Sequence, residues 1–164
     1  DESAWARGQA WAVYGYTMMY RETKKKRYLK KAQAIADFLL SNPNLPKDKI
    51  PYWDFSRPGE ERDASAGAII SSALLELSDY TKGKKKKNYF NAAEDMLESL
   101  SSDAYRTKLG EIRNFMLKHS TGHKPGNSEI DVPLIYADYY YVEALLRYKA
   151  KKEKKKIVFF HQKP

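Results

Sequence analysis

The sequence predicts an all-α fold in which helical hairpins repeat and stack into an α/α toroid. Three observations support this class. Apolar residues recur at helical spacing in five long segments, proline, glycine and charged residues separate these segments, and two helix patterns occur twice along the chain. A repeated pair of inner and outer helices is typical of a stacked or closed helical array rather than of an up-down four-helix bundle.

The first two helices are predicted at residues 3–22 and 28–40. The first has the broad apolar stripe of a buried helix, and the second ends near Asn42-Pro43 because a residue before proline avoids the α region. Residues 44–62 then form a long loop rich in proline and charge, in which the aromatic run 51–55 is expected to be ordered.

A third helix is predicted from Asp63 or Ser65, both candidate N-caps, to Tyr80. A fourth helix is predicted at 88–100, followed by a turn at 104–109 and a segment at 110–131 that contains glycine and histidine. The last helix is predicted from Pro133 to Lys151, because proline is tolerated in a first helical turn. Three of its tyrosines are expected to pack in the core, namely Tyr136, Tyr139 and Tyr140.

The repeats define the hairpins. Tyr28-Leu-Lys-Lys-Ala32 is echoed about sixty residues later by Tyr89-Phe-Asn-Ala-Ala93, each after a lysine-rich turn and a longer apolar helix. Ser72-Ala-Leu-Leu-Glu76 is echoed by Glu143-Ala-Leu-Leu-Arg147. Each hairpin is therefore expected to pair an inner helix with an outer one.

Charge is the main feature of the composition. The 164 residues include 30 Lys and Arg against 21 Asp and Glu, a formal net charge of +9, and can form one domain with a real core. Such an excess could indicate a nucleic-acid partner, but the lysines concentrate in 24–27, 84–87 and 151–156, at inferred helix ends and in the tail. Solvated lysines are the ordinary explanation there, so no nucleic-acid partner is predicted.

Other compositional features leave the compartment open. The chain has no cysteine, so neither a disulfide framework nor a thiolate site is available. No apolar run approaches a membrane span, no membrane partner is expected, and no signal peptide is visible. Because the first residue is not methionine, the sequence is expected to be a fragment, and a bacterial cytoplasmic and a periplasmic location stay open.

The segment from Trp5 to Trp11 contains the side chains that best indicate a binding site; its sequence is Trp-Ala-Arg-Gly-Gln-Ala-Trp. On a helix Arg7 and Trp11 share a face, and Gly8 lets a ligand approach the backbone beside them. An indole stacks on the C–H face of a sugar, and a guanidinium grips a carboxylate with two donors. These groups suit a sugar-acid pocket; the alternative is that both tryptophans are core residues and Arg7 a surface cation.

Five ordered blocks carry a family resemblance over about residues 1–148. They are Ser3-Ala-Trp-Ala-Arg-Gly-Gln-Ala-Trp11 with Tyr14-Gly15, Pro51-Tyr-Trp-Asp-Phe55, Arg62-Asp-Ala-Ser-Ala66, His119-Ser-Thr-Gly-His-Lys-Pro-Gly126 and Asp131-Val-Pro-Leu-Ile-Tyr-Ala-Asp-Tyr-Tyr140. With these blocks the chain resembles glycoside hydrolase family 88, the unsaturated glucuronyl hydrolases. The resemblance implies an (α/α)6 barrel, of which this chain would supply about the C-terminal half.

The resemblance also implies an activity and no cofactor. Family members hydrate the vinyl ether of an unsaturated uronyl sugar, using an aspartic acid as proton donor, and release unsaturated uronic acid from the disaccharides that lyases produce from glycosaminoglycans. The two key aspartates of the family precede the Trp-Ala-Arg-Gly-Gln block and have no counterpart here. Neither Asp54 nor Asp131 is assigned their role, and the chain alone is expected to be inactive.

Substrate-binding residues do carry over from the family pattern. Arg7 and Trp11 match residues that line the sugar pocket, and Trp5 is expected to form a third wall, although simple packing explains a buried indole equally well. Arg7 would hold the uronate carboxylate or ring hydroxyls while Trp11 stacks. Replacing Arg7 by alanine is expected to reduce substrate affinity with little loss of stability.

A second cluster predicts an anion contact. Ser120, His123 and Lys124 join a hydroxyl, an imidazole and a cation in one loop, and some family members have a sulfate pocket in this region, with a different spacing. His119, His123 and Asp131 could converge on a metal, but their spacing defines no ligand geometry, so no metal site is predicted.

The domain prediction places the C-terminal half of the barrel in residues 1–150 and a lysine-rich tail in 151–164. Its open faces are expected to expose apolar side chains that the missing N-terminal half, or another chain, would cover. The predicted ligand is an unsaturated uronyl oligosaccharide. The alternative function is a noncatalytic α/α module that binds anionic glycans or a protein partner.

Overall fold

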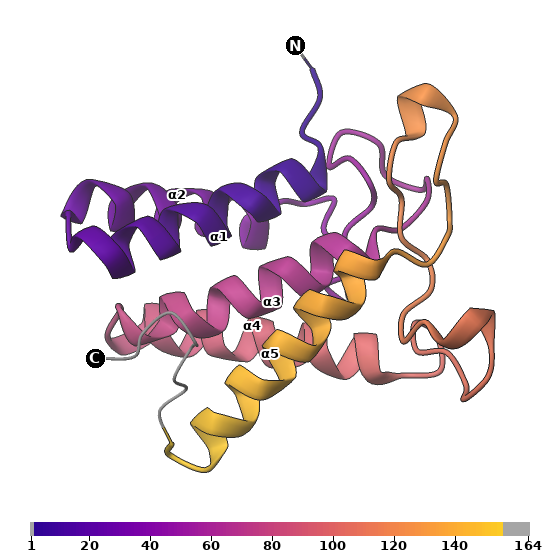
Figure 1. Cartoon of the computed structure of the whole chain (residues 1–164). Coiled ribbons are helices and arrows are strands. Elements are labelled where there is room, and N and C mark those ends of the chain that lie inside the picture. The colour runs from indigo at the N-terminus through magenta and orange to yellow at the C-terminus, as the bar shows by residue number, and fades with distance from the viewer. Residues whose placement is uncertain (1, 156–164) are drawn as a thin grey trace.

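The computed structural model describes residues 2–155 of the chain and shows a helical protein (Figure 1). The α-helices are α1 (Ala6–Thr23), α2 (Lys26–Ser41), α3 (Ala64–Asp79), α4 (Gly83–Ser101) and α5 (Ile135–Lys152), and the 3-10 turns are η1 (Ile112–Asn114) and η2 (Lys124–Gly126). Within residues 2–155 the loops form isolated β-bridges only, among them Trp5 with Asp54 and Tyr52 with Arg62.

The helices form two layers. Helices α1, α3 and α5 lie side by side and run in the same direction, while α2 packs on α1 and α4 packs on α3 (Figure 1). This is the predicted order of an inner helix followed by an outer helix, so the prediction of repeated helical hairpins is confirmed. None of the described helices has the length and hydrophobicity that a membrane crossing requires.

Helix α3 lies at the centre of the inner layer. All its residues from Ala64 to Ser78 are buried, because α1, α4 and α5 surround it. Its alanines, serines and single glycine allow these neighbours to come close, and a Cβ added to Gly67 would lie 2.9 Å from Cδ1 of Ile50. A helix whose residues are almost all apolar or small can be buried on every side, as α3 is.

The two copies of the second repeat contact each other at their first and fifth residues. Ser72 Oγ of α3 donates a hydrogen bond of 2.6 Å to Oε1 of Glu143 on α5, and these are the first residues of the two copies. The fifth residues, Glu76 and Arg147, form an ion pair of 2.9 Å. The repeated sequence therefore coincides with buried polar contacts between the two inner helices α3 and α5.

Helix ends differ from the prediction mainly at α4. Asp63 is the N-cap of α3, as predicted, and its side chain accepts a hydrogen bond from the backbone N–H of Ser65. Helix α4 begins at Gly83, five residues before its predicted start, because the lysines at 84–87 form its first turn rather than a connecting turn. Lysine is a good helix former, so nothing local stops the helix at Asn88.

The boundary between α5 and the predicted tail also differs from the prediction. Lys151 and Lys152 form the end of α5 instead of the beginning of a tail. Residues 156–164, which hold most of the predicted tail, lie outside the described residues, and the division into domain and tail stays a prediction.

Opposite ends of the inner helices have different surroundings. The connections at 42–63 and 102–134 lie at the end where α3 and α5 begin, on the right in Figure 1. The short turns between α1 and α2 and between α3 and α4 lie at the other end, together with the end of α5. The long loops and the first turn of α1 therefore meet at one end of the molecule.

Candidate functional site

Arg7 lies in the first turn of α1, next to the loop at 51–56. The backbone N–H of Ala6 donates to the carbonyl of Trp53 over 2.8 Å, and the backbone N–H of Phe55 donates to the carbonyl of Ala4 over 3.0 Å. These two bonds hold the entry to α1 against the aromatic loop, and they direct the Arg7 side chain inward, where it is 9% exposed.

The Arg7 guanidinium joins three segments. Its Nη1 donates to Oδ2 of Asp63 over 3.3 Å and to the carbonyl of Thr121 over 2.5 Å, and its Nη2 donates to the carbonyl of Gly122. Of the five donors of a guanidinium, these contacts use three. The hydrogen bonds of the described structure leave Nε and one hydrogen of Nη2 without a protein acceptor.

Asp63 is the buried counterion of this group. Burial raises the pKa of its carboxyl above the ordinary value, while Arg7 and the hydrogen bonds from Ser65 and Thr121 oppose the rise. The same carboxylate caps α3 and accepts a hydrogen bond from the backbone N–H of Thr121. It therefore links the start of α3 and the loop at 120–122 to the Arg7 site.

Two aromatic rings lie against the Arg7 guanidinium. Its Cζ lies 4.9 Å from the centroid of Trp5 and 5.4 Å from that of Tyr136 on α5. Burial raises the pKa of Tyr136, and Arg7 lowers it in part, so the phenol stays neutral beside the guanidinium. The buried Nε1 of Trp5 has no hydrogen-bond partner in the described structure. Trp5 thus acts as a wall against Arg7, the arrangement expected for a residue that fixes a cation.

Trp11 lies one turn further along α1 and faces the same helix. Its ring meets the rings of Tyr140 and Tyr14 edge to face, with centroids 5.0 Å and 6.4 Å away, and the residue is 39% exposed. Arg7 contacts Tyr136 and Trp11 contacts Tyr140, each pair of residues being spaced i, i+4 on its own helix. Arg7 and Trp11 therefore share the side of α1 that faces α5, with Arg7 inside and Trp11 open to solvent.

Open space adjoins Trp11 on α1. A Cβ added at Gly8 or Gly15 would meet no heavy atom within 4 Å, and on a helix these glycines are three residues before and four residues after Trp11. Tyr139, expected in the core, is instead 61% exposed, because its position on α5 turns outward beside Tyr140. The exposed indole and phenol are thus accessible to a ligand.

Ser120, His123 and Lys124 occupy separate environments in the described structure. Ser120 is completely buried and its Oγ has no partner, whereas His123 is exposed and its ring packs against Gly126. Lys124 forms ion pairs with Glu61 and, over 3.3 Å, with Glu60. The hydrogen bond from Lys124 to Glu61 raises the pKa of the lysine. The anion-binding role of these three residues stays a prediction.

The histidines of the same loop show no convergence. Nδ1 of His119 lies 2.6 Å from Oδ1 of Asp131, and both side chains are largely exposed. Among residues 2–155 there is no group of three or more His, Asp or Glu side chains that could hold a metal ion.

Sequence reasoning missed a buried charge network that holds Tyr14, one of the rings packed against Trp11. Glu143 accepts hydrogen bonds from Tyr14 over 3.1 Å and from Arg147 over 3.0 Å. Glu76 pairs with both Arg147 and Arg21, at 2.9 Å and 3.0 Å. The available signal was the occurrence of charged residues inside the apolar stripes of α3 and α5, which only a paired charge can occupy.

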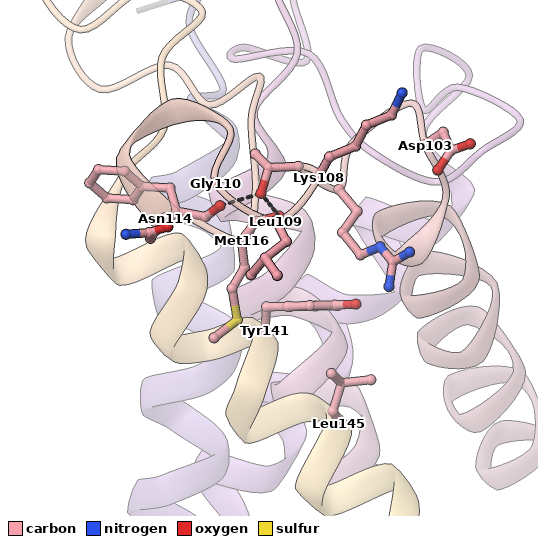
Figure 2. A pocket seen from close by; sticks show the side chains of 11 residues that line it. Asp103, Lys108, Leu109, Gly110, Asn114, Met116, Tyr141 and Leu145 are labelled. Atoms are coloured by element: carbon pink, nitrogen blue, oxygen red, sulfur yellow. Dashed lines mark hydrogen bonds between the residues drawn. The ribbon is translucent and has the colours of Figure 1, made fainter.

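A hollow of about 710 Å³ lies elsewhere, between the end of α4, the loop at 106–116 and α5 (Figure 2). Tyr141 and Leu145 form its floor on α5, and Lys108 and Asp103 lie at its rim. Its lining includes none of the residues predicted to bind substrate. This hollow is therefore separate from the Arg7 and Trp11 site.

In sequence and in fold the chain is similar to a segment of the unsaturated glucuronyl hydrolases. The chain is 51% identical to the unsaturated glucuronyl hydrolase of Formosa agariphila over 148 residues, which are 88% of this chain and 36% of that protein. It is 37% identical to the unsaturated chondroitin disaccharide hydrolase of Streptococcus pyogenes, covering 90% of this chain and 38% of that protein. No protein-family model matches the sequence.

Solved structures of unsaturated glucuronyl hydrolases also match the fold of this chain. The chain matches a crystal structure of an unsaturated glucuronyl hydrolase specific for heparin with a TM-score of 0.88 and 55% identity, over 93% of this chain and 41% of that one. A Streptococcus agalactiae unsaturated glucuronyl hydrolase mutant complexed with dGlcA-GalNAc6S matches with a TM-score of 0.84 and 33% identity, over 90% and 40% of the two chains.

The resemblance to the unsaturated glucuronyl hydrolases is thus confirmed along nearly the whole chain. The chain spans 36 to 40% of the length of the curated relatives it matches. Its place in the C-terminal half of those proteins stays a prediction.

Proposed function

We propose that this chain forms the saccharide-binding wall of an unsaturated glucuronyl hydrolase that acts on lyase-generated unsaturated disaccharides. The observation that carries the proposal is the open aromatic face around Trp11, next to a buried arginine with unused donors. The solved relative complexed with dGlcA-GalNAc6S supports the class of ligand.

In this proposal Trp11 and Arg7 have different roles in binding the sugar. Trp11 is exposed and braced by Tyr140 and Tyr14, so its indole can stack on a sugar ring without moving. Arg7 holds the loop at 121–122 in place with two donors, pairs with Asp63 through a third, and offers its remaining edge to the uronate carboxylate. Trp5 acts through Arg7, because its ring lies against the guanidinium.

Catalysis belongs to other residues in this proposal. In the family pattern the proton-donating aspartates precede the block at Trp5, and Asp54, in the loop beside that block, is engaged in hydrogen bonds from Ser3 and Ala4. The 164-residue chain is therefore expected to bind but not to hydrolyse the unsaturated disaccharide. The measurement is the ultraviolet absorbance of the conjugated double bond, which should persist with this chain.

Further helices would cover the exposed apolar surface. Ile135 and Leu146 on α5 are 71% and 57% exposed, and the hollow beside Tyr141 is lined by Leu109, Phe115 and Met116. Large apolar side chains that stay exposed on a helix are candidates for an interaction site. The expected covering is the rest of a toroid, and binding of a hydrophobic dye to the chain tests for the open face.

Titration calorimetry with an unsaturated chondroitin disaccharide tests the proposed function. Trp11→Ala should weaken binding about tenfold or more, equivalent to about 1.4 kcal/mol. The matched control is Trp53→Phe, because Trp53 lies in the loop and donates its Nε1–H to Glu60. Equal affinity of the chain and of Trp11→Ala would contradict the proposal.

A further inference from the structure

The three lysine-rich segments of the sequence meet at one end of the molecule. Residues 22–27 span the end of α1 and the start of α2, residues 79–87 span the end of α3 and the first turn of α4, and residues 149–155 include the end of α5. Because the inner helices run in the same direction, all three lie on the left of Figure 1, opposite the long loops. We call these three segments the basic end.

The basic end contains the whole charge excess of the chain. Its three segments hold fourteen lysines and arginines and three carboxylates, whereas the complete chain has a net charge of +9. The remainder of the chain is therefore slightly acidic. The lysines at 24–26, 82 and 84–87 are all exposed, so their charges face solvent.

Contacts join the segments into one surface. Lys151 of α5 forms an ion pair with Asp79 at the end of α3. Lys24, in the turn after α1, places its Nζ 5.9 Å from the ring centroid of Tyr80. Packed helices are about 8–10 Å apart, so three adjacent helix ends present a basic surface on the order of 20 Å across.

Helix-end electrostatics accounts for only part of this surface. Lysines after α1 and at the end of α5 favour the negative ends of those helices. The first turn of α4 contains the lysines at 84–87 and no acidic residue, although the positive end of a helix favours acids. Within the described residues Lys85 pairs with Asp37, while no ion pair involves Lys84, Lys86 or Lys87. These cations oppose the helix dipole and are free to bind an anion.

We propose that the basic end binds the polyanionic chain of a glycosaminoglycan, at a site separate from the disaccharide site. The proposal rests on the proposed function for its choice of polyanion. Thirteen of the fourteen cations are lysines, which act as point charges toward sulfate or carboxylate groups without requiring a fixed fork geometry.

The aromatic rings in and beside the basic end argue against single-stranded nucleic acid. Lys152 Nζ lies 5.1 Å from the ring centroid of Tyr148 and 5.7 Å from that of Phe90, and Lys24 lies over Tyr80. Nucleic-acid strands gain much of their affinity from bases stacked on open rings. The rings here are occupied by lysines, so charge alone remains as the means of recognition.

Surface plasmon resonance on immobilised heparin, at several salt concentrations, tests the proposal with the complete chain. The variant K84Q/K86Q/K87Q should lose at least tenfold in affinity, and its slope of log Kd against log salt should become shallower by about 2 to 3. The control K47Q/R57Q/K108Q removes the same charge from exposed residues outside the basic end and should stay within twofold of the parent chain.

Two outcomes would overturn the proposal: equal losses in both variants, or duplex DNA of equal total charge displacing heparin as well as heparin itself does. The Trp11→Ala variant separates this inference from the proposed function. It should keep its heparin affinity while losing the disaccharide, because Trp11 lies outside the basic end. Parallel loss of both ligands in that variant would contradict two independent sites.

Discussion

Arg7 and Asp63 form an ion pair of 3.3 Å in which the side chains are 11% and 0% exposed. Asp63 caps α3, and Arg7 lies in the first turn of α1, so the pair joins the beginnings of two inner helices. The residue predicted to contact substrate is therefore also part of the framework of the fold.

Replacing Arg7 by alanine should lower the free energy of unfolding by about 3 to 5 kcal/mol, because it leaves the Asp63 carboxylate buried without its partner. The structure thus revises the expectation of little stability loss. Urea unfolding measures the change. The double variant R7A/D63N should be less destabilised than R7A alone, and an R7A loss below about 1 kcal/mol would show that the pair is dispensable.

Gly8→Ala should separate stability from binding. Alanine is a better helix former than glycine by up to about 1 kcal/mol, and no protein atom occupies the space that its Cβ would enter, so the melting temperature should rise. The same methyl group narrows the space beside Trp11, so affinity for the unsaturated disaccharide should fall. Thermal unfolding and calorimetry together measure both effects, and a stabilised variant with unchanged affinity would argue against a ligand at this face.

Asp54 should contribute to stability in a pH-dependent way. Burial alone would raise its pKa, but hydrogen bonds from Ser3 and from the backbone N–H groups of Ser56 and Ala4 lower it below the ordinary value. A lowered pKa means that the contribution is complete above the unfolded-state value and is lost as the pH falls through the folded-state value.

Asp54→Asn should therefore cost about 1.5 to 3 kcal/mol at neutral pH, the range for hydrogen bonds to a charged group, and should flatten the acid limb of the stability profile below about pH 4. Urea unfolding across the acid range provides the comparison. An unchanged acid limb in the variant would assign that limb to other carboxyls.

Reversing the charges in the first turn of α4 should stabilise the chain. Lys84→Glu and Lys86→Glu each replace a cation at the positive end of the helix by an anion, worth about 0.3 to 1 kcal/mol per residue at low salt. The same variants should lose heparin affinity, so stability and polyanion binding would move in opposite directions. Lower stability in both variants would mean that these lysines are structural.

The sequence predicted the architecture well because local patterns determined it. The helical spacing of Ala32, Ala36 and Leu39, the cap at Asp63 and the repeated helix motifs all act within one or two turns. The start of α4 was misplaced because a lysine run fits both a helix and a turn, and no proline or cap separates the two at Gly83.

The site was predicted only in part because its geometry depends on contacts distant in sequence. The pattern identified Arg7 and Trp11, but not that the carbonyls of Thr121 and Gly122, more than a hundred residues away, would take up donors of Arg7. The partners of Lys124 in the loop at 60–61 were likewise invisible, since neither segment has a periodic pattern that fixes its position.

Nuclear magnetic resonance of the indole N–H groups during titration with an unsaturated uronyl disaccharide tests the central claim most directly. The account predicts that the Trp11 signal shifts progressively with ligand, with a smaller effect on Trp5 behind Arg7, while the Trp53 signal stays in place. A shift confined to Trp53, or three indole signals unchanged at saturating ligand, would contradict saccharide recognition at this face of α1.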